Sequence, residues 1–328
     1  MPAASNVTVM LTSAGVATAV NVISALRRPP GPAPRILAVD MNPYAAGLHL
    51  ADAWRLVPSA ADPDYEDILL DICHREKISF VFPLHSSEIE RMAAAAPRFH
   101  ATGVAMMTPT PETARLCADK QAFLDFLARE GFRFPQTLTL PLAEAPAFPL
   151  FLKPRSGSSS RGTFRIDDDM DLAYLLAKNP DSVLQEYVAG TEYTVDCLAD
   201  HGQLLACVPR VRISVKDGKS VVGRTVDHPK LCALVADLLE RLEMHGPCNA
   251  QVIENGVGQL FVIEVNPRLA AGGLTLAVQA GANIPAMMLA LAQGRAVAPA
   301  DYRRGLVMIR FPQDIFLAER PQSPTRFP

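Results

Sequence analysis

A hairpin pattern between Cys248 and Gly273 constrains the fold of this chain more than any other segment. Two apolar runs flank a glycine-containing turn, and residues 261–266 of the second run read Phe-Val-Ile-Glu-Val-Asn. Side chains alternate along a strand, so Glu264 and Asn266 should share one face. The opposite face would then carry three apolar side chains: Phe261, Ile263 and Val265.

The register of this hairpin decides which side chains meet. A turn centred between residues 257 and 258 would pair Gln251 with Glu264 and bring their Cβ atoms to about 5 Å from each other. A slip by one residue would move Gln251 to the opposite face. The predicted pairing can therefore be tested directly.

Gln251, Glu264 and Asn266 would together form an oxygen-rich face, which suits a hard cation such as Mg²⁺. Arg268 follows just after the strand, and its planar guanidinium could bind a phosphoryl oxygen. The alternative is a surface hairpin with a polar outer face. The rest of the chain has to decide between these two interpretations.

Composition indicates a folded globular protein with two or three lobes, because 328 residues with 49% hydrophobic content can build several cores. The formal net charge of −3 predicts no general attraction to nucleic acid or to anionic membranes. We find no secretory signal or membrane span and expect a cytoplasmic protein. The cysteines form no C-x-x-C pair and should be reduced packing residues: Cys73, Cys117, Cys197, Cys207, Cys232 and Cys248.

The first third of the chain alternates strands and helices. Strands are predicted at 7–11, 35–39 and 78–82, with helical patterns between them, which indicates a parallel sheet with right-handed crossovers. Gly15 and Asp40 faintly suggest a dinucleotide site, but the G-x-G-x-x-G spacing is absent, so a nicotinamide oxidoreductase is disfavoured.

His85, Ser86 and Glu88 follow the predicted strand at 78–82. Open parallel sheets bind ligands beyond the carboxyl ends of their strands, so these side chains could contact substrate. The alternative is a helix cap formed by Ser86 or Ser87.

Two lysines and a loop favour a bound anion. Lys120 begins a predicted helix, where the macrodipole disfavours a cation unless an anion is near, although many such lysines are simply solvated. Lys153 ends an apolar strand and is followed by a loop rich in glycine and serine, 156–162, that could fold its N–H groups around phosphates. The loop has no Walker A motif, and the alternative is a disordered hairpin tip.

Further candidates follow along the chain. The predicted strand at 183–188 could offer backbone donors and acceptors to an adenine beside an apolar wall. Glu192 on the next strand is a candidate acceptor for ribose hydroxyls. Arg210 and Arg212 share a face of a long strand and could bind a substrate carboxylate, unless they are only a solvated surface.

The order of these motifs along the chain resembles that of the ATP-grasp enzymes. The motifs are the two lysines, the loop, Gln185-Glu186-Tyr187-Val188, Gln251 and Glu264-Val265-Asn266-Pro267-Arg268. Within that family, the sequence is similar to the carboxylate–amine ligases related to the carbamoyl-phosphate synthase large subunit. The resemblance implies an α/β pre-ATP-grasp domain with a parallel sheet, followed by a two-lobed α+β ATP-grasp domain. It suggests four segments: a Rossmann-like domain at 1–115, a small lobe at 116–185, a large lobe with the metal site at 186–315, and a tail at 316–328.

The resemblance also implies roles for the site residues. Lys120 and Lys153 would contact the phosphates of ATP, with Gln251 and Glu264 binding one Mg²⁺ and Glu264 and Asn266 a second, or Mn²⁺ in their place. Arg268, Lys153 and Glu264 would be catalytic, with Arg268 orienting the γ-phosphate and the acyl phosphate. The remaining nucleotide contacts would come from Ser156, Gly157, Ser158, Gly162, Glu186, Tyr187, Val188 and Glu192. The substrate candidates are His85, Glu88, Arg210, Arg212, Gly272 and Gly273.

The predicted activity is an ATP-dependent ligase that joins a small-molecule carboxylate to an amine and releases ADP and phosphate. A homodimer is a further hypothesis. One alternative is an ATP-grasp enzyme that uses water, a thiol or a carbamate-type acid. A second is a subunit that binds ATP without catalysis, for which the full set of lysines, metal ligands and Arg268 would be unnecessary.

Overall fold

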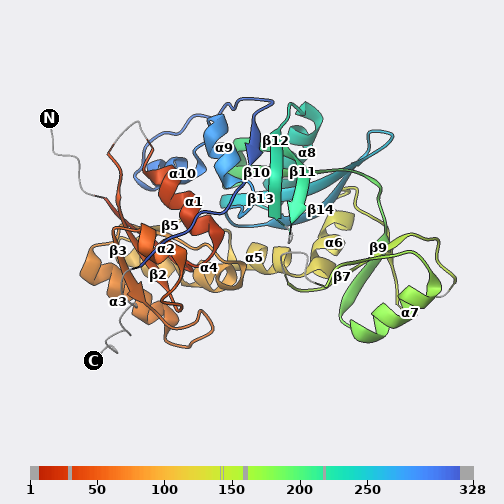
Figure 1. Ribbon diagram of the computed structural model, residues 1–328, viewed down its shortest axis with the longest axis horizontal. Coiled ribbons are helices and arrows are strands. Elements are labelled where there is room, and N and C mark those ends of the chain that lie inside the picture. The colour runs from red at the N-terminus through yellow and green to blue at the C-terminus, as the bar shows by residue number, and fades with distance from the viewer. Residues whose placement is uncertain are drawn as a thin grey trace.

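Three β-sheets follow one another along the long axis of the molecule (Figure 1). The computed structural model describes residues 7–317, except for 29–31, 141, 143, 158–161 and 217–218. In the view of Figure 1 the N-terminal sheet lies on the left, the largest sheet in the middle and the smallest on the right.

The N-terminal sheet is parallel, as predicted, with the strand order β3-β2-β1-β4-β5. Its central strand β1 is buried along its whole length, which explains the uninterrupted apolar run in the sequence. The sequence analysis did not identify β3 and β5, which are short. The strands are β1 (Thr8–Leu11), β2 (Arg35–Asp40), β3 (Ala53–Leu56), β4 (Phe80–Phe82) and β5 (Ala105–Met106). The helices are α1 (Ala17–Leu26), α2 (Ala46–Leu50), α3 (Tyr65–Glu76) and α4 (Ser86–Ala101).

Gly15 and Asp40 have a structural role in this sheet. The Asp40 carboxylate accepts hydrogen bonds from the backbone N–H of Gly15 at 2.7 Å and of Asn42 at 2.8 Å. It thereby ties together the loops that follow β1 and β2. The faint dinucleotide pattern in the sequence is thus explained by a loop contact.

Two helices, α5 (Pro111–Ala118) and α6 (Lys120–Arg129), connect the N-terminal sheet to the smallest sheet. Asp119 caps α6 by accepting hydrogen bonds from the backbone of Gln121 at 3.0 Å and of Ala122 at 3.2 Å. The smallest sheet is antiparallel, has the order β6-β9-β7-β8 and packs against α7. Its elements are β6 (Thr137–Leu138), β7 (Leu150–Pro154), β8 (Phe164–Ile166), α7 (Asp169–Lys178) and β9 (Ser182–Glu186).

The largest sheet is antiparallel and has the order β14-β13-β10-β11-β12-β15. Apolar residues of α8 and α6 pack with its strands in one core cluster, and α9 and α10 share a second cluster with the N-terminal sheet. Its strands are β10 (Gly190–Asp200), β11 (Gln203–Lys216), β12 (Lys219–Thr225), β13 (Gly246–Asn255), β14 (Leu260–Asn266) and β15 (Val307–Ile309). The helices are α8 (Pro229–Arg241), α9 (Leu274–Ala280) and α10 (Ile284–Ala292).

A β-bulge in the hairpin of β13 and β14 changes the predicted alternation. Gln251 pairs with Glu264, as predicted, but Val252 pairs with Val262, which leaves Ile263 as the extra residue. Val262 and Val265 therefore enter the core at 0% and 1% exposure, whereas Ile263 lines the cavity described below together with Glu264. The prediction that Ile263 and Val265 share a face was wrong, because the bulge reverses the alternation between them.

Cysteines that are far apart in sequence are neighbours in the largest sheet. Cys197 on β10 lies opposite Cys207 on β11 and also opposite Cys248 on β13. All six cysteines are free thiols, and Cys73, Cys197 and Cys248 are buried.

Among the described helices, none is by itself long and apolar enough to cross a membrane. Only α9 and α10 taken together reach that length and composition, and they are bent by 81° relative to each other.

The bulge predicts different effects for two neighbouring substitutions. Val265→Ala should lower the free energy of unfolding by about 2 kcal/mol, because it leaves a cavity in a closed core. Ile263→Ala should cost less than about 1 kcal/mol, because its side chain already borders open space. Urea unfolding of the two variants measures the difference, and equal losses would contradict the bulged register.

Candidate active site

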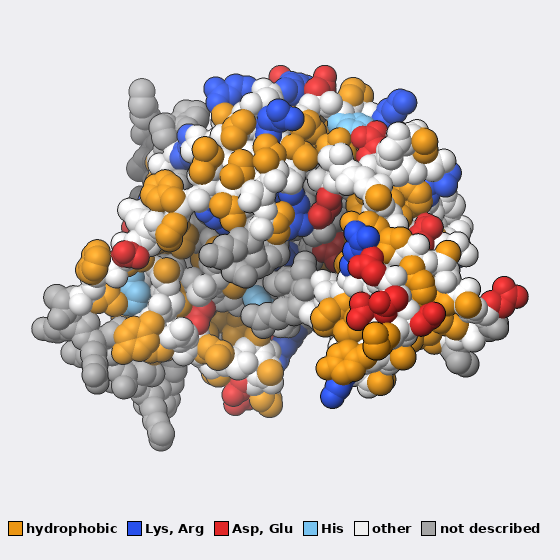
Figure 2. All heavy atoms as spheres, turned by 45° about the vertical axis from the view of Figure 1, so that its right-hand side comes forward, with side chains coloured by type: hydrophobic (Ala, Val, Ile, Leu, Met, Phe, Trp, Pro, Cys, Tyr) orange, Lys and Arg blue, Asp and Glu red, His pale blue; other side chains and the backbone are white. Residues whose placement is uncertain are grey.

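A cavity of about 430 Å³ lies between the smallest and the largest sheet, and most of the predicted site residues line it. The smallest sheet contributes Phe151 and Lys153, and the β13–β14 hairpin contributes Gln251 and Glu264. The segment from β9 to β10 contributes Glu186, Tyr187, Val188, Gly190, Glu192 and Thr194. Figure 2 shows basic and acidic side chains meeting at a hollow near the centre of this face of the molecule.

Glu264 lies at the centre of the polar part of this cavity. Its Oε1 accepts hydrogen bonds from Gln251 Nε2 at 2.9 Å and from Asn266 Nδ2 at 2.7 Å. Within the described part of the chain, Oε2 of Glu264 has no hydrogen-bond partner. The register and strand alternation thus bring together the three oxygen-bearing side chains that the sequence analysis selected.

Asn249 supports the segment from Asn266 to Arg268, and sequence reasoning missed it. Its Nδ2 donates to the backbone oxygens of Asn266 at 3.4 Å and Arg268 at 3.2 Å. The side chain is 5% exposed and lines the cavity. Because Asn249 is two residues from Gln251 on one strand, the same period-2 argument could have found it.

Arg268 connects the cavity to the N-terminal domain. Its Nε donates to Ser86 Oγ at 2.6 Å, and its Nη1 donates to the backbone oxygen of Leu269 at 3.1 Å. Burial lowers the pKa of Arg268, while the nearby Glu264 carboxylate opposes that shift. A guanidinium placed in this way is desolvated and can bind an anion strongly.

Lys153 is a buried cation in the cavity. Its side chain is on β7, only 4% of the residue is exposed, and no ion pair of Lys153 occurs among the described residues. Burial lowers its pKa to about 8, an effect that Glu264 opposes and Lys120 reinforces. The negative charge of a ligand phosphate would stabilise the charged form of this buried lysine further.

Lys120 reaches the loop that follows Lys153. Its Nζ donates to the backbone oxygen of Gly157 at 3.2 Å. Its backbone N–H donates to the backbone oxygen of Arg155 at 3.0 Å. Arg155 also pairs with Asp119 at 2.7 Å, and this interaction lowers the pKa of the Asp119 carboxyl. The start of α6 is thereby fixed to the start of the loop.

The structure places only part of the predicted loop in the cavity wall. Ser156 and Gly157 line the cavity, whereas Gly162 is not among the lining residues and lies next to Pro154. Ser158 falls outside the described residues.

The exit of β9 lies at the apolar end of the cavity. Glu186, Tyr187 and Val188 all line it, and the Glu186 carboxylate accepts a hydrogen bond from the backbone of Gln136 at 3.0 Å. The N–H and C=O groups of Val188 have no hydrogen-bond partner among the described residues. The apolar wall here consists of Pro135, Phe151, Ile253 and Ile263.

Glu192, Arg210 and Arg212 line the cavity, and each of them forms an ion pair with a residue of the neighbouring strand. Glu192 pairs with Arg212 at 2.5 Å, and Arg210 forms a buried ion pair of 2.7 Å with Asp196. Cross-strand pairing therefore explains both arginines in part, because β10 and β11 lie side by side. The predicted contacts of Glu192 with ribose and of the two arginines with a carboxylate stay predictions, and each would have to share its side chain with the ion-pair partner.

Gly272 lines the cavity, whereas Gly273 lies behind it. A Cβ atom on Gly273 would come within 1.9 Å of Arg210 Nε, so this position requires glycine to let the guanidinium pass. Arg310 donates to the backbone oxygens of Ala271 at 3.3 Å and Gly272 at 3.1 Å and so fixes this segment. The sequence analysis missed Arg310, which is distant in the chain.

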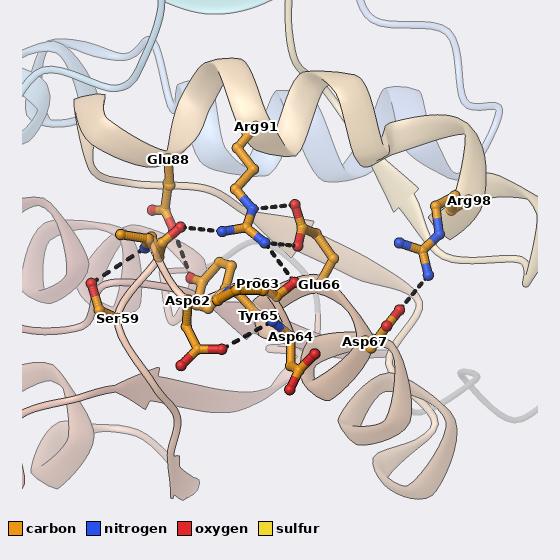
Figure 3. Close-up of polar contacts among 12 residues, drawn as sticks. Ser59, Asp62, Pro63, Asp64, Tyr65, Glu66, Asp67, Glu88, Arg91 and Arg98 are labelled. Carbon is orange, nitrogen blue, oxygen red and sulfur yellow. Dashed lines mark hydrogen bonds and ion pairs between the residues drawn. The ribbon is translucent and has the colours of Figure 1, made fainter.

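Glu88 and His85 are placed differently from the prediction that they contact substrate. Glu88 is fully buried, and its carboxylate accepts hydrogen bonds from Thr12 Oγ1 at 2.9 Å and Tyr65 Oη at 2.8 Å. Figure 3 shows Glu88 pointing to Tyr65, beside the pair of Arg91 and Glu66. His85 caps α4 by accepting from the backbone of Ser87 at 3.2 Å, and neither His85 nor Glu88 lines the cavity. A helix cap is present here, as the alternative proposed, but the capping side chain is that of His85 and not that of Ser86 or Ser87.

The residues in the cavity fit a nucleoside triphosphate with a divalent cation. Lys120, Lys153 and Arg268 supply positive charge to the lining, which also contains the apolar wall and the exit of β9. Glu264 offers an oxygen without a hydrogen bond, and rotation of the Gln251 and Asn266 amides would turn their oxygens to a cation. Such an all-oxygen set suits Mg²⁺.

Comparison with known proteins agrees with this arrangement. Residues 9–107 match the family model "PylC-like, N-terminal domain", and residues 178–310 match "ATP-grasp in the biosynthetic pathway with Ter operon". The chain is 23% identical over 201 residues to a D-alanine–D-alanine ligase of Petrotoga mobilis, which covers 56% of this chain and 67% of the relative. It is 26% identical over 239 residues to the 3-methyl-D-ornithine–L-lysine ligase of Methanosarcina barkeri, with 71% and 60% covered. A carbamoyl phosphate synthase large chain of Clostridium perfringens is 29% identical over 184 residues, but this chain spans only 17% of its length.

Solved structures share the fold at low sequence identity. The N5-carboxyaminoimidazole synthetase of Staphylococcus aureus, complexed with ADP, superimposes with a TM-score of 0.73 at 11% identity and covers 93% of this chain and 82% of its own. The L-amino acid ligase of Bacillus licheniformis gives a TM-score of 0.68 at 17% identity, with 88% and 74% covered. These structures show the same fold, and residues 178–310 match an ATP-grasp domain. More particularly, a PylC-like N-terminal domain precedes this ATP-grasp domain, and the named relatives of the chain include carboxylate–amine ligases.

The low pKa of Lys153 predicts proton uptake when a nucleotide binds. Phosphate charge beside Lys153 should raise its pKa from about 8, so the bound protein should hold more protons at pH 8 to 9 than the free protein. Affinity for ATP should accordingly fall as pH rises through this window.

Titration calorimetry at pH 8.5 in buffers with different ionisation enthalpies measures this uptake directly. Lys153→Met should bind ATP more weakly, and its remaining binding should take up fewer protons than the wild type. Equal uptake by both proteins would show that Lys153 does not carry the proton.

Proposed function

We propose that this protein is an ATP-dependent ligase that activates a carboxylate as an acyl phosphate and joins it to an amine. The observation that carries the proposal is the convergence of Lys120, Lys153, Glu264 and Arg268 in one cavity, although they come from three separate segments. A protein that only binds a nucleotide has no need for a cation site and an arginine at the phosphate end.

The nucleotide would lie between the smallest and the largest sheet. Its adenine would contact the apolar wall and the open backbone groups of Val188. Lys120 and Lys153 would neutralise the phosphates, with Ser156 and Gly157 beside them. The ion pair with Arg212 holds Glu192 near the entrance, so a ribose contact of Glu192 would have to share its carboxylate with that arginine.

Gln251, Glu264 and Asn266 would hold Mg²⁺, which when bound supplies charge neutralisation at the β- and γ-phosphates. Lys153 would hold the transferring phosphoryl group from one side. Arg268 would orient that group and the carboxylate that attacks it, because Ser86 and the backbone oxygen of Leu269 fix its Nε and Nη1 while the side chain lines the cavity. The protein would contribute position and charge, without a covalent enzyme intermediate.

The reaction would proceed in two balanced steps. A carboxylate oxygen attacks the γ-phosphorus, the bond to the β-phosphate oxygen breaks, and ADP leaves with that electron pair. The amine nitrogen then attacks the acyl carbon, phosphate departs with the oxygen that it received from the carboxylate, and the nitrogen loses a proton. The segment Ala270–Gly272, beside Arg210 and Arg212, would border the carboxylate substrate.

Two relatives support a carboxylate and an amine as substrates, since their names are those of a D-alanine–D-alanine ligase and a 3-methyl-D-ornithine–L-lysine ligase. We accordingly propose small amino acids or similar compounds as both substrates. A homodimer and a cytoplasmic location remain predictions.

Glu264→Gln should reduce substrate-dependent ADP release by at least about a hundredfold, because it removes the one carboxylate of the cation site. The experiment incubates the protein with ATP, Mg²⁺ and pooled amino acids, measures ADP, and identifies condensed products by mass spectrometry.

Glu254→Gln is the matched control, because Glu254 is on the same hairpin but contacts Tyr193 and His228 away from the cavity lining. It should keep wild-type turnover. Wild-type turnover in Glu264→Gln would refute the assigned site. ATP binding without ADP release across a broad panel of acids and amines would instead favour a non-catalytic nucleotide-binding subunit.

A further inference from the structure

A second cavity of about 560 Å³ lies away from the nucleotide site, where the N-terminal domain meets the largest sheet. Ala93, Ala96 and His100 of α4 line one side, and His201, Glu243 and His245 line the other. None of these residues lines the nucleotide cavity. Three histidines therefore border one cavity that the proposed ligase reaction does not use.

Asp200, His201 and His245 have the arrangement of a metal-binding cluster. One ligand atom from each residue lies within 4.8 Å of the other two. The Oδ1 atom of Asp200 is 3.1 Å from His245 Nδ1 and 3.8 Å from His201 Nε2. Three ligands at about 2.0 to 2.2 Å from one ion lie about 3.5 Å apart, so only small side-chain movements would be needed.

The environment of His245 is a second observation that favours a cation at this cluster. Its Nδ1 is buried, and its nearest charged neighbour is Asp200 Oδ1 at 3.1 Å, with which it forms an ion contact but no well-directed hydrogen bond among the described residues. A buried ring nitrogen without a partner is costly, and a bound ion would satisfy it. The ring of His245 also stacks on that of His201, with 4.3 Å between the ring centroids and 18° between their planes.

The position of His201 is unusual for its residue type. His201 and Gly202 form the two-residue turn between β10 and β11, with φ angles of +47° and +82°. Asparagine is the preferred residue at the first position of such a turn, since it tolerates a positive φ better. A histidine here presents its ring next to Asp200 and His245 at some conformational cost.

We propose that Asp200, His201 and His245 bind one divalent transition-metal ion of the zinc class. Two imidazoles and a carboxylate are borderline donors that suit Zn²⁺, Co²⁺ or Ni²⁺ better than Mg²⁺. His201 and His245 also line the second cavity, where His100 of the N-terminal domain is a further nitrogen donor within the lining. The ion ties the β10–β11 turn to the segment before β13, at the boundary with the N-terminal domain.

The test uses the full chain without a histidine tag, in the absence of nucleotide and with excess Mg²⁺ to occupy oxygen-only sites. Titration with Co²⁺ should give one equivalent of bound ion with the visible absorption of a four- or five-coordinate nitrogen and oxygen site, and Zn²⁺ should displace it. Zn²⁺ should also raise the thermal unfolding midpoint of the wild type.

His201→Asn is the decisive variant, because asparagine suits the turn and the side chain of His201 is 82% exposed, so folding should be preserved. It should lower Co²⁺ affinity at least about tenfold and abolish the Zn²⁺-dependent rise in the midpoint. The matched control is His74→Ala on α3, an exposed histidine outside the cluster, which should bind Co²⁺ like the wild type.

Three results would overturn the proposal. The first is the absence of stoichiometric Co²⁺ binding to the wild type, and the second is unchanged binding by His201→Asn. The third is an intense near-ultraviolet band of cobalt thiolate, which would place the ion at the neighbouring Cys197, Cys207 and Cys248 instead.

Discussion

One oxygen of the Glu264 carboxylate accepts hydrogen bonds from two side-chain amides, and the polar part of the proposed nucleotide cavity is arranged around these two hydrogen bonds. Gln251 reaches it across the hairpin and Asn266 along the strand. The contact requires the pairing of Gln251 with Glu264, and the bulge at Ile263 adjusts the register next to it. The same bulge turns Ile263 into the cavity wall and leaves Val262 and Val265 in the core. The extra residue, Ile263, thus lets the same hairpin carry the polar side chains, part of the apolar wall and part of the closed core.

The strands around the hairpin extend this arrangement to the rest of the molecule. Asn249 holds the backbone after β14, and Arg268 reaches Ser86 at the start of α4. Lys153 comes from the opposite sheet, and it is a buried cation with no ion pair among the described residues. Residues from all three parts of the molecule, the N-terminal domain and the two antiparallel sheets, therefore lie near the proposed phosphate site.

The parts of the fold and of the candidate site that depend on contacts between nearby residues in the chain could be predicted from the sequence. Alternation in β14 and a short turn sufficed to place Gln251 opposite Glu264, and the strand–helix alternation of the first third gave the parallel sheet. Contacts between distant segments were not predictable in this way. The burial of Glu88 depends on Thr12 and Tyr65, and the ion pairs of Arg210 and Arg212 depend on which strand lies beside β11. The face of Ile263 depends on a bulge, which leaves no clear mark in composition or periodicity.

The central claim is that the cavity passes a phosphoryl group from ATP to a carboxylate oxygen. The most direct measurement uses amino acids labelled with ¹⁸O in their carboxyl groups, incubated with ATP, Mg²⁺ and the protein, followed by mass analysis of the released phosphate. Our account predicts phosphate that carries one ¹⁸O atom from the carboxylate, formed in equal amount to the amide product. Amide or ADP formation with unlabelled phosphate would contradict it, because the carboxylate oxygen would then never have been bonded to phosphorus.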